Sequence, residues 1–141
     1  LRGHAIECRI CAEDPITMLQ APGKIAGFET TFPQGIRFDH CLYPKFTITP
    51  DFDPMVGKLI ARGLNRDVAV RKIRAALDGL ILEGLKTNIP LLKVIMDEEN
   101  FKKGQYTTHY IASVKPQDKV AIVENIESYI PRIVSVEMGQ V

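Results

Sequence analysis

The 141-residue sequence predicts an α+β fold, with a mostly antiparallel sheet followed by packed helices. Three observations lead to this prediction. Hydrophobic and polar residues alternate along short segments before residue 64, which is the period of half-buried strands. These segments follow one another closely, as antiparallel strands do. From residue 65 onward, hydrophobic residues recur every three or four positions, which is the period of an amphipathic helix.

The first predicted strand begins at His4 and ends at the Asp14-Pro15 turn. Its alternation turns one set of side chains toward the core: Ile6, Cys8 and Ile10. The opposite face carries Glu7, Arg9 and Cys11. Glu7 and Arg9 then point the same way, roughly 7 Å apart. They form either an ordinary surface ion pair, which contributes little to stability, or part of a functional site.

Further strands are expected over 24–31 and 35–43, next to the first one in an antiparallel sheet. The proline-rich segment 44–54 reads as an ordered loop with a strand-like centre. A longer strand is expected over 55–63, where it ends at Gly63. This part of the chain therefore supplies most of the sheet.

The best-defined predicted helix begins at its N-cap Asn65 and ends near Gly79. A return to the sheet is expected over 80–87. Asn88 then caps a second helix that runs through Met96 or beyond, because a proline in the first turn is tolerated there.

Composition excludes several classes of protein. The net charge is +1, and no run of lysines and arginines suggests a nucleic-acid partner. No hydrophobic run approaches the ~18 residues of a membrane span, and the sequence has no signal-peptide pattern. The three cysteines favour reduced thiols, so we expect a cytoplasmic protein. Because strand-like sequence follows Leu1 directly, we also expect the chain to be a piece of a longer one.

Cys8 and Cys11 form a C-x-x-C pattern, which in other proteins holds zinc or performs redox chemistry. On a strand, positions three apart face opposite sides, and no second ligand pair is present in the sequence. The interpretation we favour is a small core residue at Cys8 and an ordinary thiol at Cys11, with no metal bound. A metal-binding or redox module is the alternative for this cysteine pair. Taken together, the residues by themselves indicate only a small α+β domain with a polar face.

Four segments, in order and with compatible spacing, resemble the C-terminal domain of biotin carboxylases: GHAIECRICAEDP at 3–15, APGKI at 21–25, DPMVGKLI at 53–60 and GLKTN at 84–88. Biotin carboxylases are the ATP-dependent component of acetyl-CoA, propionyl-CoA and pyruvate carboxylases. The resemblance implies a biotin carboxylase C-terminal domain over 1–113. It leaves 114–141 as a helical tail or linker.

The resemblance also implies a reaction. ATP, with Mg²⁺ or Mn²⁺, phosphorylates bicarbonate, and the resulting carboxyphosphate delivers CO₂ to N1 of biotin. The implied partners are upstream ATP-grasp domains, a biotin carboxyl carrier protein or domain, a carboxyltransferase component and a second copy in a homodimer. By itself this chain is then expected to bind no cofactor and to be inactive. The alternative is a non-catalytic assembly or dimerisation module of a carboxylase complex.

Four residues take roles from the resemblance. Arg9 matches a catalytic arginine that stabilises the ureido oxygen of biotin when N1 loses its proton. Asp53 matches an aspartate that contacts biotin or orients this arginine, although an Asp before Pro is also a common turn residue. Arg37 matches a position at the homodimer interface. Thr108 matches a residue at the edge of the adenine.

Overall fold

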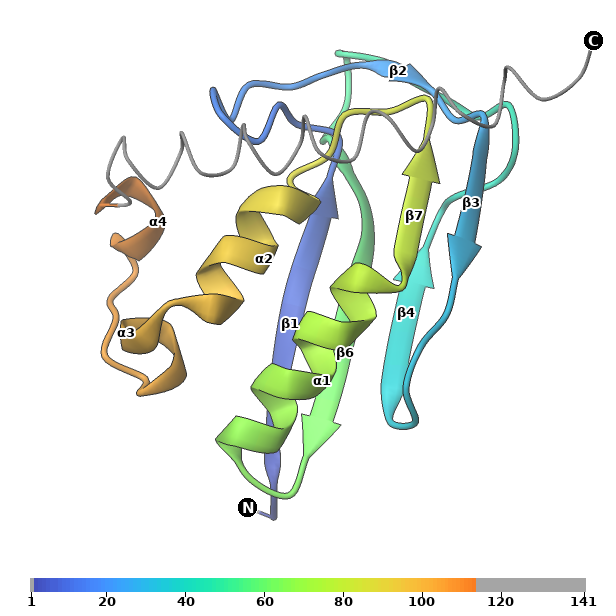
Figure 1. Cartoon of the computed structure of the whole chain (residues 1–141). Coiled ribbons are helices and arrows are strands. Elements are labelled where there is room, and N and C mark those ends of the chain that lie inside the picture. The colour runs from blue at the N-terminus through green and yellow to red at the C-terminus, as the bar shows by residue number, and fades with distance from the viewer. Residues whose placement is uncertain (1, 114–141) are drawn as a thin grey trace, which may run out of the picture.

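The computed structural model describes residues 2–113, so the tail predicted over 114–141 lies outside the described residues. The elements in chain order are β1 (His4–Cys11), β2 (Gly23–Lys24), β3 (Gly27–Thr30), β4 (Ile36–His40), β5 (Thr47–Ile48), β6 (Met55–Gly63), α1 (Arg66–Asp78), β7 (Leu80–Glu83), α2 (Ile89–Asp97), α3 (Glu99–Lys102) and α4 (Tyr110–Ser113). Figure 1 shows the helices on one side of the strands, which confirms the α+β prediction. Within the described range, each helix is too short or too polar to cross a bilayer.

A three-stranded antiparallel sheet, in the order β1-β6-β4, forms the centre of the domain. The strand predicted over 55–63 is therefore confirmed, and it lies between the other two. The strands that follow one another in the sequence were expected to pair with one another, but β3 pairs with β7. The two-residue strands β2 and β5 form a separate pair. Strand proximity in the sequence thus predicted antiparallel pairing correctly but chose the wrong partners.

Helix α1 covers the sheet, as its pattern predicts. Its buried face is formed by Ala69, Val70, Ile73, Ala76 and Leu77. The side chain of Asn65 accepts a hydrogen bond from Val68 N at 2.9 Å, which confirms the predicted N-cap. Gly79 ends the helix at φ −84°, where a Cβ atom would collide with the carbonyl oxygen of Thr31. Gly79 is therefore needed for close approach rather than for an unusual backbone conformation.

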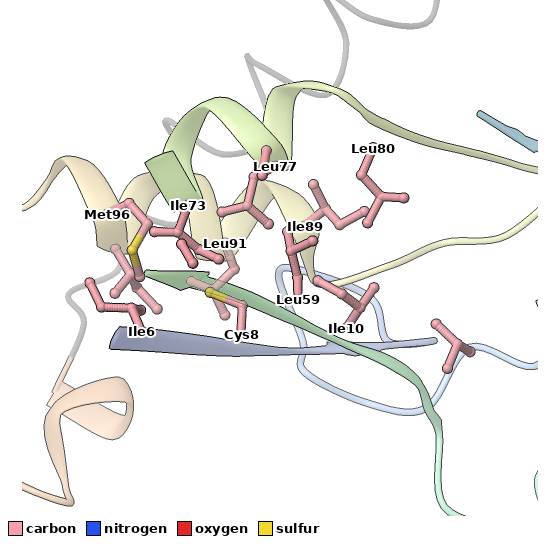
Figure 2. Packing of buried hydrophobic residues seen from close by; sticks show 14 of the residues in the cluster. Ile6, Cys8, Ile10, Leu59, Ile73, Leu77, Leu80, Ile89, Leu91 and Met96 are labelled. Carbon is pink, nitrogen blue, oxygen red and sulfur yellow. The ribbon is translucent and has the colours of Figure 1, made fainter. Parts of the chain in front are cut away.

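The hydrophobic core lies between the sheet and the helices. Ile6, Cys8 and Ile10 of β1 are buried, as the alternation predicts. Figure 2 shows these three side chains on the side of β1 that faces the helices. Leu59 of β6 and Ile73 of α1 are completely buried in the same cluster. One face of β1 is thereby committed to the core, and the other is left for the solvent.

Helix α2 begins directly after Asn88, at the predicted position. The predicted role of this side chain is wrong, however, because Asn88 makes no capping hydrogen bond to α2. The helix ends at Asp97, and α3 follows as a separate short helix after the extended residue Glu98. Figure 1 shows the first turn of α2 beside the C-terminal end of β1. Hydrogen bonds to Arg9 and Cys11 hold Asn88 next to this strand.

Candidate functional site

The solvent side of β1 presents Arg9, whose guanidinium meets a carboxylate from a distant part of the chain. Arg9 Nη2 lies 3.5 Å from Asp53 Oδ2, although the two residues are 44 positions apart. The second oxygen of Asp53 accepts a hydrogen bond from Met55 N at 2.8 Å, at the start of β6. Both side chains are largely exposed, at 58% and 64%. The guanidinium is therefore oriented by Asp53 and still accessible to a ligand.

Glu7 does not pair with Arg9, in contrast to the simple ion pair considered from the sequence. Its carboxylate instead lies 4.0 Å from Lys58 Nζ on the neighbouring strand β6. Lys58 is the residue directly opposite Arg9 in the β1–β6 register. The outer face of these two strands thus carries alternating charges.

A cavity of about 340 Å³ lies beside Arg9, between β1, α2 and the segment 101–111. Its polar lining includes Glu7, Arg9 and Thr108. Its apolar lining includes Leu92 and Ile95 of α2. The structure thus brings Arg9 and Thr108, which are far apart in the sequence, to one cavity. Asp53 lies outside this cavity and reaches it only through its ion pair with Arg9.

Asn88 also lines the cavity, and its contacts are ones that sequence reasoning missed. Its Oδ1 accepts a hydrogen bond from Cys11 N at 2.9 Å, and its Nδ2 donates one to Arg9 O at 3.0 Å. Its own backbone N–H donates to Cys11 O at 3.1 Å. An asparagine before a helix is the usual signal for a cap, so the local sequence concealed a long-range role.

The Cys11 side chain is buried, whereas the alternation predicted it on the same face as Arg9. The correction has a local cause, because the β1–β6 register shifts between Ile10 and Cys11. Burial raises the pKa of Cys8 to about 12, and Glu7 adds to the shift. Burial also raises the pKa of Cys11 to about 11, with a further contribution from Glu13. Such thiols stay protonated at neutral pH and are poor nucleophiles and metal ligands.

The described part of the chain contains no cluster of side chains that could bind a metal ion. There, no group of three or more His, Cys, Asp and Glu side chains is placed to hold an ion. Cys8, Cys11 and Cys41 are all free thiols. The C-x-x-C pattern is therefore accounted for by one core position and one position turned inward by the register shift.

Arg37 lies away from the other predicted site residues. It is on β4, which is separated from β1 by β6. Its Nη2 lies 2.7 Å from Asp39 Oδ2, and its Nε donates to Asp39 Oδ1 at 2.9 Å. These hydrogen bonds hold the pKa of the Asp39 carboxyl below its usual value. Arg37 is thus exposed and paired within its own strand, and the structure does not bring it to the cavity.

The family model for the biotin carboxylase C-terminal domain matches residues 7–113. This chain belongs to that family. It is 45% identical to the biotin carboxylase of Haemophilus influenzae, over 79% of this chain and 25% of that protein. It is 43% identical to the biotin carboxylase of Pseudomonas aeruginosa, over 84% of this chain and 26% of that protein. The chain therefore spans about a quarter of the length of these relatives.

Solved structures give the same result. The biotin carboxylase domain of the Hydrogenobacter thermophilus 2-oxoglutarate carboxylase, solved with MgADP and bicarbonate, matches with a TM-score of 0.79. It is 37% identical, and the match covers 84% of this chain and 26% of that one. The biotin carboxylase subunit of a pyruvate carboxylase matches with a TM-score of 0.78 at 40% identity, covering 84% of this chain and 26% of that one. The resemblance read from four sequence segments is confirmed, while the roles of the individual site residues stay predictions.

Proposed function

We propose that this biotin carboxylase C-terminal domain contributes Arg9 to the site where biotin is carboxylated at N1, within a complete ATP-dependent enzyme. The observation that carries the proposal is the exposed guanidinium of Arg9, a residue that also lines a cavity of about 340 Å³. Among the described residues its only hydrogen-bond partner is Asp53, so donors remain for a ligand oxygen. Family membership supplies the class of reaction.

The chemistry requires a donor of this kind. When N1 of biotin loses its proton, negative charge moves onto the ureido oxygen, and the nitrogen becomes nucleophilic enough to attack CO₂. A positioned guanidinium stabilises this charge because it is always protonated and presents several N–H groups in one plane. We place the base that accepts the proton in the ATP-grasp part of the enzyme, together with the groups that bind ATP and its metal ion. Arg9 stabilises charge and transfers no proton.

Asp53 has a positioning role in this proposal. One oxygen is held by the backbone of Met55, and the other faces Arg9. The carboxylate therefore limits the directions in which the arginine side chain can swing. The same geometry permits a direct contact with biotin, because the Asp53 side chain is 64% exposed.

The remaining assignments follow from the proposed activity. The complete enzyme uses ATP with Mg²⁺ or Mn²⁺ in the cytoplasm, and a biotin carboxyl carrier presents biotin to this site before a carboxyltransferase component uses the product. Thr108 lies at the cavity, where it borders the adenine of the nucleotide. Arg37 contributes to a homodimer interface through the outer strand β4.

A second candidate function is an assembly module without a catalytic role. The observation that favours it is the outer position of β4, which presents the exposed pair Arg37 and Asp39 to a partner. The two functions differ in their dependence on Arg9, because assembly through β4 does not involve the far edge of the sheet.

The decisive experiment compares Arg9→Ala with wild type in the complete enzyme. We expect biotin-dependent carboxylation to fall about 100- to 1000-fold, since one donor aimed at developing charge has this effect. Bicarbonate-dependent ATP hydrolysis without biotin should be retained. Arg62→Ala, which removes an exposed arginine of β6, is the matched control. Full carboxylation by Arg9→Ala would reject the catalytic proposal and leave the assembly module.

A further inference from the structure

Among residues 2–113, strand β1 pairs with another strand on one side only, because it lies at the edge of the three-stranded sheet. The ladder to β6 is also irregular where β1 ends, with a register shift between Ile10 and Cys11. Backbone groups on a free edge need other partners or solvent. The segment next to Arg9 is therefore the part of β1 that the sheet itself holds least firmly.

Asn88 supplies partners at this place. Its side chain bonds to Arg9 O and Cys11 N, and its backbone N–H bonds to Cys11 O. These three hydrogen bonds, from 2.9 to 3.1 Å, span the register shift. Asn88 uses one amide as both donor and acceptor, as a neighbouring strand would use its backbone. It makes no capping bond to its own helix.

We infer that Asn88 is a positioning residue for Arg9, acting through the backbone of β1. Fixing the Arg9 carbonyl group limits rotation of the peptide planes on the free edge, and so sets the direction in which the Arg9 side chain leaves the strand. Asn88 and Arg9 also line the same cavity, so a displaced strand would change the wall that faces a ligand. The inference rests on the proposed function of Arg9, because positioning matters only if Arg9 takes part in the reaction.

The test is a double-mutant cycle in the complete enzyme, with free biotin as the substrate. Asn88→Ala should lower biotin-dependent carboxylation about 10- to 100-fold, because a small displacement of a catalytic group has an effect of this size. Bicarbonate-dependent ATP hydrolysis without biotin should be retained. In the Arg9→Ala background, Asn88→Ala should have no further effect, because residues that act as a unit are not additive.

Asn65→Ala is the matched control. It removes the same amide from the start of α1, and with it a capping hydrogen bond, but this bond goes to Val68 of its own helix and not to β1. Loss of stability alone would therefore lower carboxylation in both alanine variants alike, whereas positioning affects only Asn88→Ala. If Asn88→Ala does not fold, Asn88→Asp enters the same cycle. This variant keeps an oxygen that accepts from Cys11 N, and it replaces the NH₂ group that donates to Arg9 O with a carboxylate oxygen, which cannot donate.

The outcomes separate the two proposals. Normal carboxylation by Arg9→Ala rejects the proposed function, and the inference with it. A large loss in Arg9→Ala with normal carboxylation in the Asn88 variant rejects the inference alone. So does an Asn88 effect that persists undiminished when Arg9 is already absent.

Discussion

Asp53→Asn removes the negative charge that faces Arg9 while keeping the turn that holds residue 53. The asparagine oxygen can still accept the hydrogen bond from Met55 N, which measures 2.8 Å in the wild type. The other carboxylate oxygen, which lies 3.5 Å from Arg9 Nη2, becomes an uncharged NH₂ group that cannot accept a hydrogen bond from the guanidinium. The substitution therefore tests the orientation of Arg9 by Asp53 separately from the local fold.

The expected effect is small, because the pair is in contact with solvent. Two unit charges 3.5 Å apart attract each other by about 1.2 kcal/mol in bulk water. Exposed pairs measured by double-mutant cycles contribute about 0.2–1 kcal/mol, and these side chains are 58% and 64% exposed. This energy corresponds to a change of about 1.4- to 5-fold in the ratio of Arg9 held toward Asp53 to Arg9 turned away from it. We expect biotin-dependent carboxylation to fall by no more than this factor, far less than in Arg9→Ala.

The assay is biotin-dependent ADP release by the complete enzyme at low and high salt. Because salt screens exposed charges, the difference between wild type and Asp53→Asn should shrink between about 0.1 and 1 M salt. Asp97→Asn is the control, since Asp97 is 59% exposed and pairs with Arg74 instead of Arg9. A loss in Asp53→Asn as large as that in Arg9→Ala would refute the reasoning. It would mean that Asp53 takes part in the chemistry directly.

Three further predictions concern the domain itself. At pH 8, a thiol reagent should modify Cys41 quickly and Cys8 and Cys11 only after unfolding, because Cys41 is exposed and the other two are buried with raised pKa values. The pKa of Asp14 is lowered from 3.8 to about 2, mainly by backbone hydrogen bonds from Thr17 and Ile16, so its contribution to stability is present above about pH 4 and is lost as the pH falls toward 2. Urea unfolding across this range should show a shallower acid loss in Asp14→Asn than in wild type. At neutral pH, the same urea method should show that Asn65→Ala destabilises the domain by about 1 kcal/mol through loss of its cap.

The elements that sequence alone could predict are those specified by nearby residues. The alternation of β1 placed Ile6, Cys8 and Ile10 correctly, because side-chain direction along a strand depends only on parity. The start of α1 was predictable because Asn65 caps the helix that it precedes. Each of these two patterns lies within a short stretch of sequence: a few residues of a strand, or the first turn of a helix.

The elements that escaped prediction depend on distant parts of the chain. The pairing of β3 with β7 could not be predicted from spacing, because α1 lies between them in the sequence. The register shift at Ile10 reverses the side expected for Cys11, and no local pattern marks it. The capping signal of Asn88 was a correct indication of helix position and a wrong one of side-chain role. A side chain that bonds across 77 or 79 positions leaves no periodic trace in the sequence.

The edge position of β1 explains why these long-range contacts gather around Arg9. A central strand would hold an arginine firmly, but both neighbours would crowd it. An edge strand leaves the side chain open to a large substrate and gives up half of its backbone partners. In this domain Asn88 replaces part of the missing ladder, and Asp53 restrains the guanidinium from the side of β6. The edge position of β1 thereby keeps Arg9 accessible to a substrate, while Asn88 and Asp53 orient it.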